Sequence, residues 1–195
     1  MLNVELPAVW QDEVQQQLFR LLLNCISLPG TVADLSIHLG ESSALIGVLA
    51  TLLDNTVSLH DVDGLLTDSD RRFLNSPNAG LSEARFIVAD GAIAPDQDFS
   101  PNLGTLDCPE FGATVILQGQ QLGNGELTLH LNGPGISPQA GKKHSLSLMG
   151  FHQDWFTCRQ EWVNAFPLGI DLILVDATRV TMIPRTTHVI LDCGF

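Results

Sequence analysis

The segment 11–26 constrains the fold more than any other part of the chain, because its apolar residues recur at helical spacing. One stripe along this predicted helix contains Val14, Leu18, Leu21, Leu22 and Cys25. Phe19, Leu23 and Ile26 extend the apolar surface beyond one face. A helix of this kind is either deeply buried or packed against a partner protein. Pro29-Gly30 predicts where the helix stops.

Further helices are predicted at 43–54, 68–74 and 151–166. Ser42 or Ser43 would cap the first of these. In the last one, an apolar side would be formed by Trp155, Cys158, Trp162 and Ala165. The stretch 90–111 is rich in Pro, Gly and Asp and is expected to be a long loop.

Strand patterns are interspersed with these helices. Short apolar or alternating runs occur at 56–60, 85–89, 113–118, 126–131, 170–175 and 180–183, with a further candidate at 188–191. Asn124-Gly125 favours a hairpin between 113–118 and 126–131. The mixture of elements, with no internal repeat or linker, predicts one α/β domain over residues 1–195.

The charge of the chain excludes several classes of partner. With 22 acidic and 9 basic residues, the formal net charge is −13. A field of that sign repels nucleic acids and anionic lipid surfaces. No apolar run is long enough to cross a membrane, and the first residues do not resemble a signal peptide. We therefore expect a cytoplasmic protein with reduced cysteines, most of them acting as small hydrophobic side chains.

Motifs for cofactor chemistry are weak or absent. The stretch 135–143 resembles a P-loop, but five residues instead of four separate its glycines, and Lys143 replaces the hydroxyl. A pyridoxal phosphate enzyme needs a lysine for its Schiff base, and only Lys142 and Lys143 exist. A zinc site at His144, His152 and Cys158 has no usual spacing. The sequence thus predicts no cofactor and no metal.

Four segments resemble one known family. The strings are Phe19-Arg20 with 27–30, then 112–117, 131–136, and 166–174 followed by 183–189. In this order they are similar to the PhnH subunit family of bacterial carbon–phosphorus lyase, over nearly the whole chain. The chain departs from the family at Phe73-Leu74-Asn75 and around Asn24-Cys25.

The resemblance implies a subunit that helps to form α-D-ribose 1-methylphosphonate 5-triphosphate from ATP and methylphosphonate. It implies other subunits of the complex as partners. From the wide apolar surface of the helix predicted at 11–26 and the nearly all-apolar helix predicted at 43–54, we also expect a homodimer when the chain is isolated. The resemblance also implies a mixed sheet flanked by helices, similar to pyridoxal-phosphate-dependent transferases but without the cofactor lysine. Radical cleavage of the carbon–phosphorus bond would belong to other subunits.

The candidate ligand residues gather near the C-terminus, where five of the nine basic residues lie. Arg185, Thr186, Thr187 and His188 could together bind a phosphonate or nucleotide phosphate, just past a strand where ligand-binding loops of α/β sheets gather. The alternative for Arg185 is a structural bond to a helix end or a carboxylate such as Asp171.

Three further residues have both a ligand role and a structural alternative. Gly133 and Gly135 could bring backbone N–H groups to an anion, or form an ordinary turn. Arg20 could reach a ligand or a partner subunit, or extend into solvent.

Two functions of different classes therefore remain. One is an assembly subunit without chemistry of its own, and the other is a chain that contributes part of a phosphonate or nucleotide site. A stand-alone transferase-like protein that binds a phosphorylated small molecule is the alternative outside the family.

Overall fold

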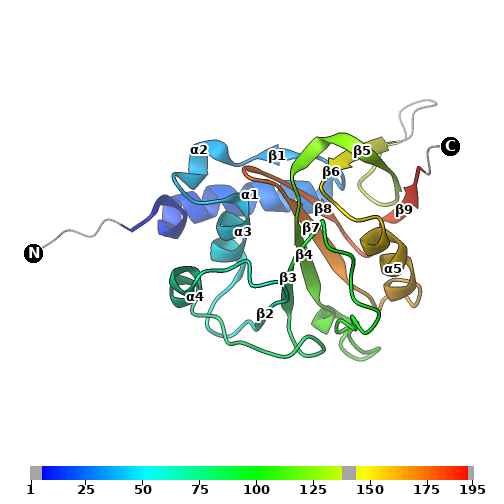
Figure 1. Ribbon diagram of the computed structural model, residues 1–195, viewed down its shortest axis with the longest axis horizontal. Helices are drawn as coiled ribbons and strands as arrows, with labels where there is room; N and C mark the ends of the chain where they lie inside the picture. The colour runs from blue at the N-terminus through cyan, green and yellow to red at the C-terminus, as the bar shows by residue number, and fades with distance from the viewer. Residues whose placement is uncertain (1–5, 138–143, 193–195) are drawn as a thin grey trace, which may run out of the picture.

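Six strands form the central sheet of the computed structural model, which describes residues 6–137 and 144–192 (Figure 1). Across the sheet the order is β1–β8–β7–β4–β3–β2. The strands are β1 (Ala33–Asp34), β2 (Leu59–Asp61), β3 (Phe86–Asp90), β4 (Thr114–Gln118), β7 (Asp171–Val175) and β8 (Arg179–Ile183). The first four from the β2 edge are parallel, and β8 alone runs against them, because β7 and β1 each pair with it in antiparallel fashion. The predicted α/β class with a mixed sheet is confirmed.

The central strands are apolar on both faces because both faces are covered. In β4, Val115, Ile116 and Leu117 are all fully buried. Val115 and Leu117 contribute to one hydrophobic core and Ile116 to the other. A continuous apolar run of this kind is typical of a buried parallel strand.

Helices cover one face of the sheet (Figure 1). The longest are α1 (Asp12–Ser27) and α3 (Ala44–Leu52), and the shorter ones are η1 (Ala8–Trp10), α2 (Ser36–Leu39) and α4 (Asp68–Leu74). In α1 only Leu18, Leu22 and Cys25 are buried. Ser43 is the residue that caps α3, since its hydroxyl accepts a hydrogen bond from the Ile46 N–H.

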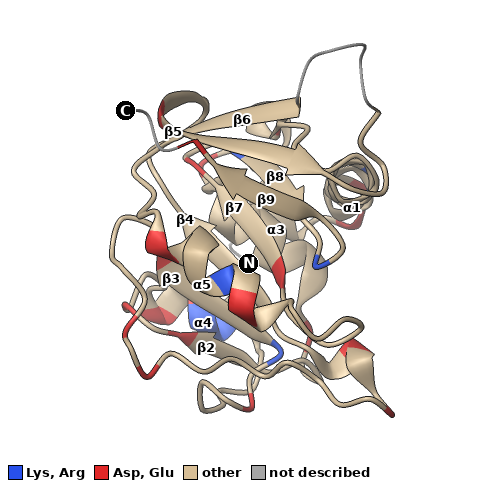
Figure 2. Ribbon diagram, turned by 90° about the vertical axis from the view of Figure 1, so that its right-hand side faces the viewer, with Lys and Arg blue, Asp and Glu red and all other residues tan. Residues whose placement is uncertain are grey.

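A second, three-stranded antiparallel sheet and α5 cover the other face. This sheet has the order β6–β5–β9, with β5 at Gln121–Asn132, β6 at His144–Met149 and β9 at His188–Leu191. Helix α5 (Asp154–Trp162) packs beside β9 (Figure 2). A short helix, η2 (Pro109–Phe111), ends the long loop before β4. The sequence pattern had predicted the strand at 188–191 but not which sheet it joins.

The predicted hairpin between 113–118 and 126–131 is wrong. β4 lies between β3 and β7 in the large sheet, and β5 pairs with β6 and β9 in the small one. The Asn124-Gly125 pair lies within β5, where the register against β6 shifts between Leu122 and Leu127. The turn signal therefore marks a bulge in a long strand rather than the end of a hairpin.

Two other boundaries differ from the sequence pattern. The strand expected at 56–60 begins only at Leu59, because the Asp54 carboxylate accepts hydrogen bonds from the N–H and hydroxyl of Thr56 and holds a turn there. The helix expected at 151–166 is restricted to Asp154–Trp162, and Ala165, expected on its apolar side, is exposed.

Candidate functional site

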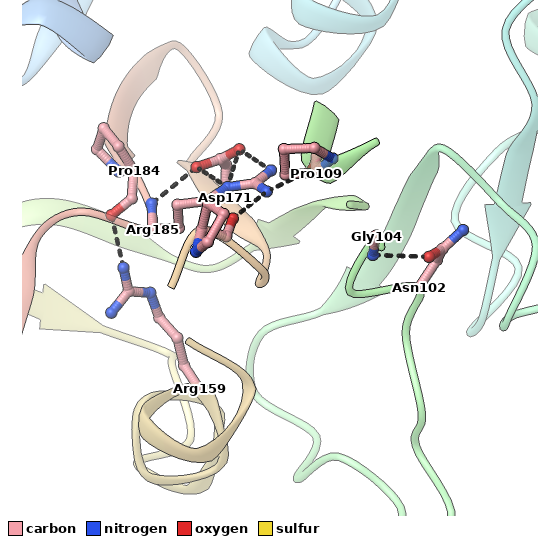
Figure 3. A network of polar contacts seen from close by, with 8 residues as sticks. Asn102, Gly104, Pro109, Arg159, Asp171, Pro184 and Arg185 are labelled. Carbon is pink, nitrogen blue, oxygen red and sulfur yellow. Dashed lines mark hydrogen bonds and ion pairs between the residues drawn. The ribbon is translucent and has the colours of Figure 1, made fainter. Parts of the chain in front are cut away.

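Arg185 lies in the turn between β8 and β9 and binds Asp171, the first residue of β7 (Figure 3). The Arg185 Nη2 atom is 2.7 Å from Asp171 Oδ2, and Nε is 3.2 Å from the same oxygen. The Arg185 backbone N–H donates to Oδ1 at 2.7 Å. The two side chains are only 14% and 24% exposed. Of the two roles considered for Arg185, this geometry is that of the structural bond to a carboxylate.

Three segments of the family resemblance meet at this ion pair. Arg185 Nη1 also donates to the carbonyl of Pro109 at 2.8 Å and contacts that of Pro167 at 3.4 Å (Figure 3). A Cβ atom on Gly112 would lie 2.8 Å from Nη1, so the guanidinium fits only beside a glycine. Arg185 in 183–189 therefore bonds to Asp171 and Pro167 in 166–174 and to Pro109, just before 112–117.

The ion pair lies at the amino ends of the parallel strands, because Asp171 begins β7 and Arg185 follows the antiparallel strand β8. This is the edge opposite to the one expected, since ligands of open α/β sheets bind at the carboxyl ends. At the carboxyl ends, Phe151 covers Gly91 and Gly119, where added Cβ atoms would come within 2.7 Å and 2.1 Å of its ring.

The other three candidates of the 185–188 cluster line one open groove with Arg185. The groove has a volume of about 1090 Å³ and lies between β9 and the α5 region. Thr187 is buried, Thr186 is half-buried, and His188 is exposed. Arg185, Thr186, Thr187 and His188, which are consecutive in the chain, therefore share one groove.

Arg159 is a groove residue that sequence reasoning missed. It lies on α5, is 1% exposed, and donates from Nη2 to the Pro184 carbonyl at 2.6 Å (Figure 3). Its Nη1 donates to the Thr187 carbonyl at 3.1 Å. Burial lowers its pKa to about 10, which leaves it charged at neutral pH, and the negative charge of Asp171 partly opposes that shift. The sequence signal that could have revealed Arg159 was its spacing. It follows Trp155 by one helical turn, which places it on the same side of the predicted helix as that apolar residue.

The remaining candidates lie elsewhere or contact protein backbone. A Cβ on Gly133 would lie 2.9 Å from the Thr186 carbonyl oxygen, and one on Gly135 would lie 2.2 Å from that of Ser27. Both glycines therefore allow close approaches between chain segments. Arg20 is exposed on α1, outside the groove lining.

The described residues contain no group of three His, Cys, Asp or Glu side chains arranged to hold a metal ion. Cys25 is a buried free thiol, and Cys108 and Cys158 are half-buried free thiols. Lys142 and Lys143, with most of the P-loop-like stretch, lie outside the described residues. No helix in the described part of the chain is long and apolar enough to span a membrane.

The fold is that of a three-layer α/β protein. Its candidate site is an open groove beside the buried side chain of Arg159. Its residues 8–190 match the family described as bacterial phosphonate metabolism protein (PhnH), and the chain belongs to this family.

Two relatives have sequences similar to most of the chain. The "Putative C-P lyase subunit protein HtxG" of Stutzerimonas stutzeri is 40% identical over 181 residues, which cover 93% of this chain and 88% of the relative. The "Alpha-D-ribose 1-methylphosphonate 5-triphosphate synthase subunit PhnH" of Rhizobium meliloti (strain 1021) is 29% identical over 190 residues, with 88% of each chain covered. The family resemblance seen in the sequence is confirmed.

Proposed function

We propose that this protein is a subunit of a carbon–phosphorus lyase complex in organic phosphonate catabolism. In that role it takes part in forming α-D-ribose 1-methylphosphonate 5-triphosphate from ATP and methylphosphonate, in the cytoplasm. The proposal rests on membership of the PhnH family and on two relatives, one named as a C-P lyase subunit and the other as a subunit of the synthase.

The observation that carries an assembly role is the α1 surface, formed by Phe19, Leu23 and Ile26. These side chains are 50%, 53% and 42% exposed, although all three are large and apolar. They border a small groove of about 230 Å³ whose other walls include Leu52 and Met182. A continuous apolar surface of this kind favours protein–protein contact. The α1 surface would contact another complex subunit, and a second copy of this chain when the protein is isolated.

The groove next to Arg159 favours a second candidate, in which the chain contributes part of a phosphonate or nucleotide site. Neither candidate requires a cofactor in this chain. The likeness to pyridoxal-phosphate-dependent transferases that the family resemblance implies stays a proposal. The stand-alone alternative differs in one respect, because it predicts ligand binding without partner subunits.

Co-purification tests the assembly role. Leu23→Glu places a charge in the α1 surface. It should abolish both the proposed dimerisation, measured by light scattering, and capture by tagged partner subunits. Ile37→Glu is the matched control, because Ile37 on α2 is 86% exposed but does not border the α1 groove. This variant should assemble as the wild type does. Circular dichroism should show both variants folded.

The results of this experiment test the subunit role and the contact at the α1 surface separately. A wild-type chain that never co-purifies with the partner subunits would contradict the subunit role. Normal assembly of Leu23→Glu would instead show that the contact lies elsewhere on the protein.

A further inference from the structure

Arg159 is a buried cation whose hydrogen-bonding partners in the structure are uncharged. Its two contacts are to the carbonyl oxygens of Pro184 and Thr187. Arg71, Arg179 and Arg185, by contrast, each bind a carboxylate. Within the described residues no carboxylate lies within ion-pair distance of Arg159, and Asp171 is already bound to Arg185. A buried charge without a counter-charge is unfavourable and is normally paired.

Two buried polar atoms beside this charge have no hydrogen-bond partner among residues 6–137 and 144–192. They are Nε of Arg159 and Oγ1 of Thr187, and both residues are 1% exposed. Both residues also line the same groove. Buried polar atoms are nearly always satisfied, so two unsatisfied ones on facing segments indicate a missing partner that accepts hydrogen bonds.

The groove is also unusual in its charge. Of the described residues that line it, two are arginines and none is Asp or Glu, although the chain contains 22 acidic residues. Figure 2 shows how acidic residues outnumber basic ones over the ribbon as a whole. In a protein of net charge −13, an anion can be held only where the local field is positive. Because Asp171 already pairs with Arg185, Arg159 is the described lining residue whose positive charge meets that condition.

We propose that this groove binds the phosphate or phosphonate group of a small molecule, with Arg159 as the counter-charge and the Thr187 hydroxyl as a donor. Arg185 has a different part, since it is bound to Asp171 and positions the 184–187 turn that carries Thr187. His188, exposed at the rim, is placed to contact the rest of the molecule. The volume of about 1090 Å³ accommodates a ligand larger than a single ion.

Calorimetric titration of the full chain with methylphosphonate, inorganic phosphate and ATP tests this site. The wild type should bind at least one of them saturably, and the tightest of the three identifies the source of the anion. Arg159→Met should weaken that binding by at least about tenfold, since charge-assisted hydrogen bonds are lost. Arg159→Lys should recover part of it, because the charge remains without the planar fork.

Thr187→Val is the second variant, because removing Arg159 also breaks its bonds to the 184–187 turn. The Thr187 hydroxyl has no partner in the described structure, so valine preserves the packing while removing the donor. Affinity should fall by at least about fivefold. Thr181→Val is the matched control: Thr181 on β8 is fully buried with an unpartnered hydroxyl, but it does not line the groove. Its binding should equal that of the wild type.

Two results would overturn the proposal: no saturable binding of any probe by the wild type, or wild-type affinity in folded Arg159→Met and Thr187→Val. The choice of probes rests on the proposed function, but the readouts are separate. A chain that co-purifies with partner subunits and binds no probe overturns the groove alone. A chain that binds phosphate but never co-purifies overturns the subunit role alone.

Discussion

The carboxylate of Asp171 binds both the side chain and the backbone N–H of Arg185, at the open end of the β7–β8 hairpin. The tight turn of this hairpin lies at the other end, where the Asp176 carboxylate binds Arg179. Each end of the hairpin is therefore closed by an aspartate–arginine pair. The pair at the open end also reaches the Pro109 carbonyl and so joins the long loop to the sheet.

Arg185→Ala should destabilise the protein by about 2–4 kcal/mol, because the mostly buried Asp171 carboxylate loses its counter-charge. For a chain of this size the melting temperature should fall by roughly 5–15 °C. Arg185→Lys should be nearly as unstable, since one ammonium group cannot reproduce the contacts to Asp171 and Pro109. Thermal unfolding followed by circular dichroism measures both.

Arg72→Ala is the control for this prediction. Arg72 is exposed on α4, and its removal should change the free energy of unfolding by less than about 0.5 kcal/mol. An Arg185→Ala protein that melts with the wild type would show that the ion pair contributes no net stability. Weakened anion binding by that variant at low temperature, where it is still folded, would support the positioning role given to Arg185, and unchanged binding would contradict it.

Ser43→Ala should cost about 1 kcal/mol of stability, because α3 loses the hydroxyl that accepts from the Ile46 N–H. Ser42→Ala provides the comparison, since Ser42 precedes the cap and should change stability little. Urea unfolding curves give both values. Equal effects of the two substitutions would contradict the assignment of Ser43 as the cap.

Gly135→Ala should prevent stable folding or lower stability strongly. Its φ of +79° is unfavourable for alanine, and the new Cβ would lie 2.2 Å from the Ser27 carbonyl oxygen. Gly64→Ala separates these two effects, because Gly64 has a φ of +70° with no atom within 4 Å. That variant should lose only about 1–2 kcal/mol in a urea titration. Similar losses at both positions would mean that the crossing at Ser27 can relax.

Cys25 should make stability sensitive to alkaline pH. Burial raises the pKa of its thiol from 9.0 to about 11. Because the folded-state pKa is raised, the stabilisation is fully present below pH 9 and is lost as the pH rises to 11. Between these values the wild type should lose about 2–3 kcal/mol more than Cys25→Ala does. Parallel pH dependences of the two urea midpoints would contradict this.

The sequence pattern predicted the elements that depend on neighbouring residues. The apolar periodicity of 11–26 predicts a helix that the structure contains as α1. The short helix predicted at 68–74 is α4, which begins with a capping box between Thr67 and Asp70. The strands β7 and β8 lie within a residue of their predicted ends, because a tight turn joins two strongly apolar runs. In each case the signal and the structure occupy the same stretch of chain.

Pairing between distant strands was not predictable in the same way. Asn124-Gly125 is a valid hairpin signal by its local chemistry, yet β5 runs through it as a bulge and pairs with β6. The preceding strand, β4, is drawn into the large sheet because its apolar residues need cover on both faces. The competition between these two sheets is decided by burial, which no short window of sequence records.

The sequence by itself determined the α/β class, the family, and the gathering of Arg185, Thr186, Thr187 and His188, which are adjacent in the chain. Only the tertiary structure decided what each arginine does. Arg185 is bound by Asp171, fourteen positions away, and by Pro109, 76 positions away. Arg159, on helix α5, donates only to carbonyl oxygens within the described part of the chain. An ion pair depends on which side chains meet in space and on how much water is excluded around them, and the folded chain alone sets both.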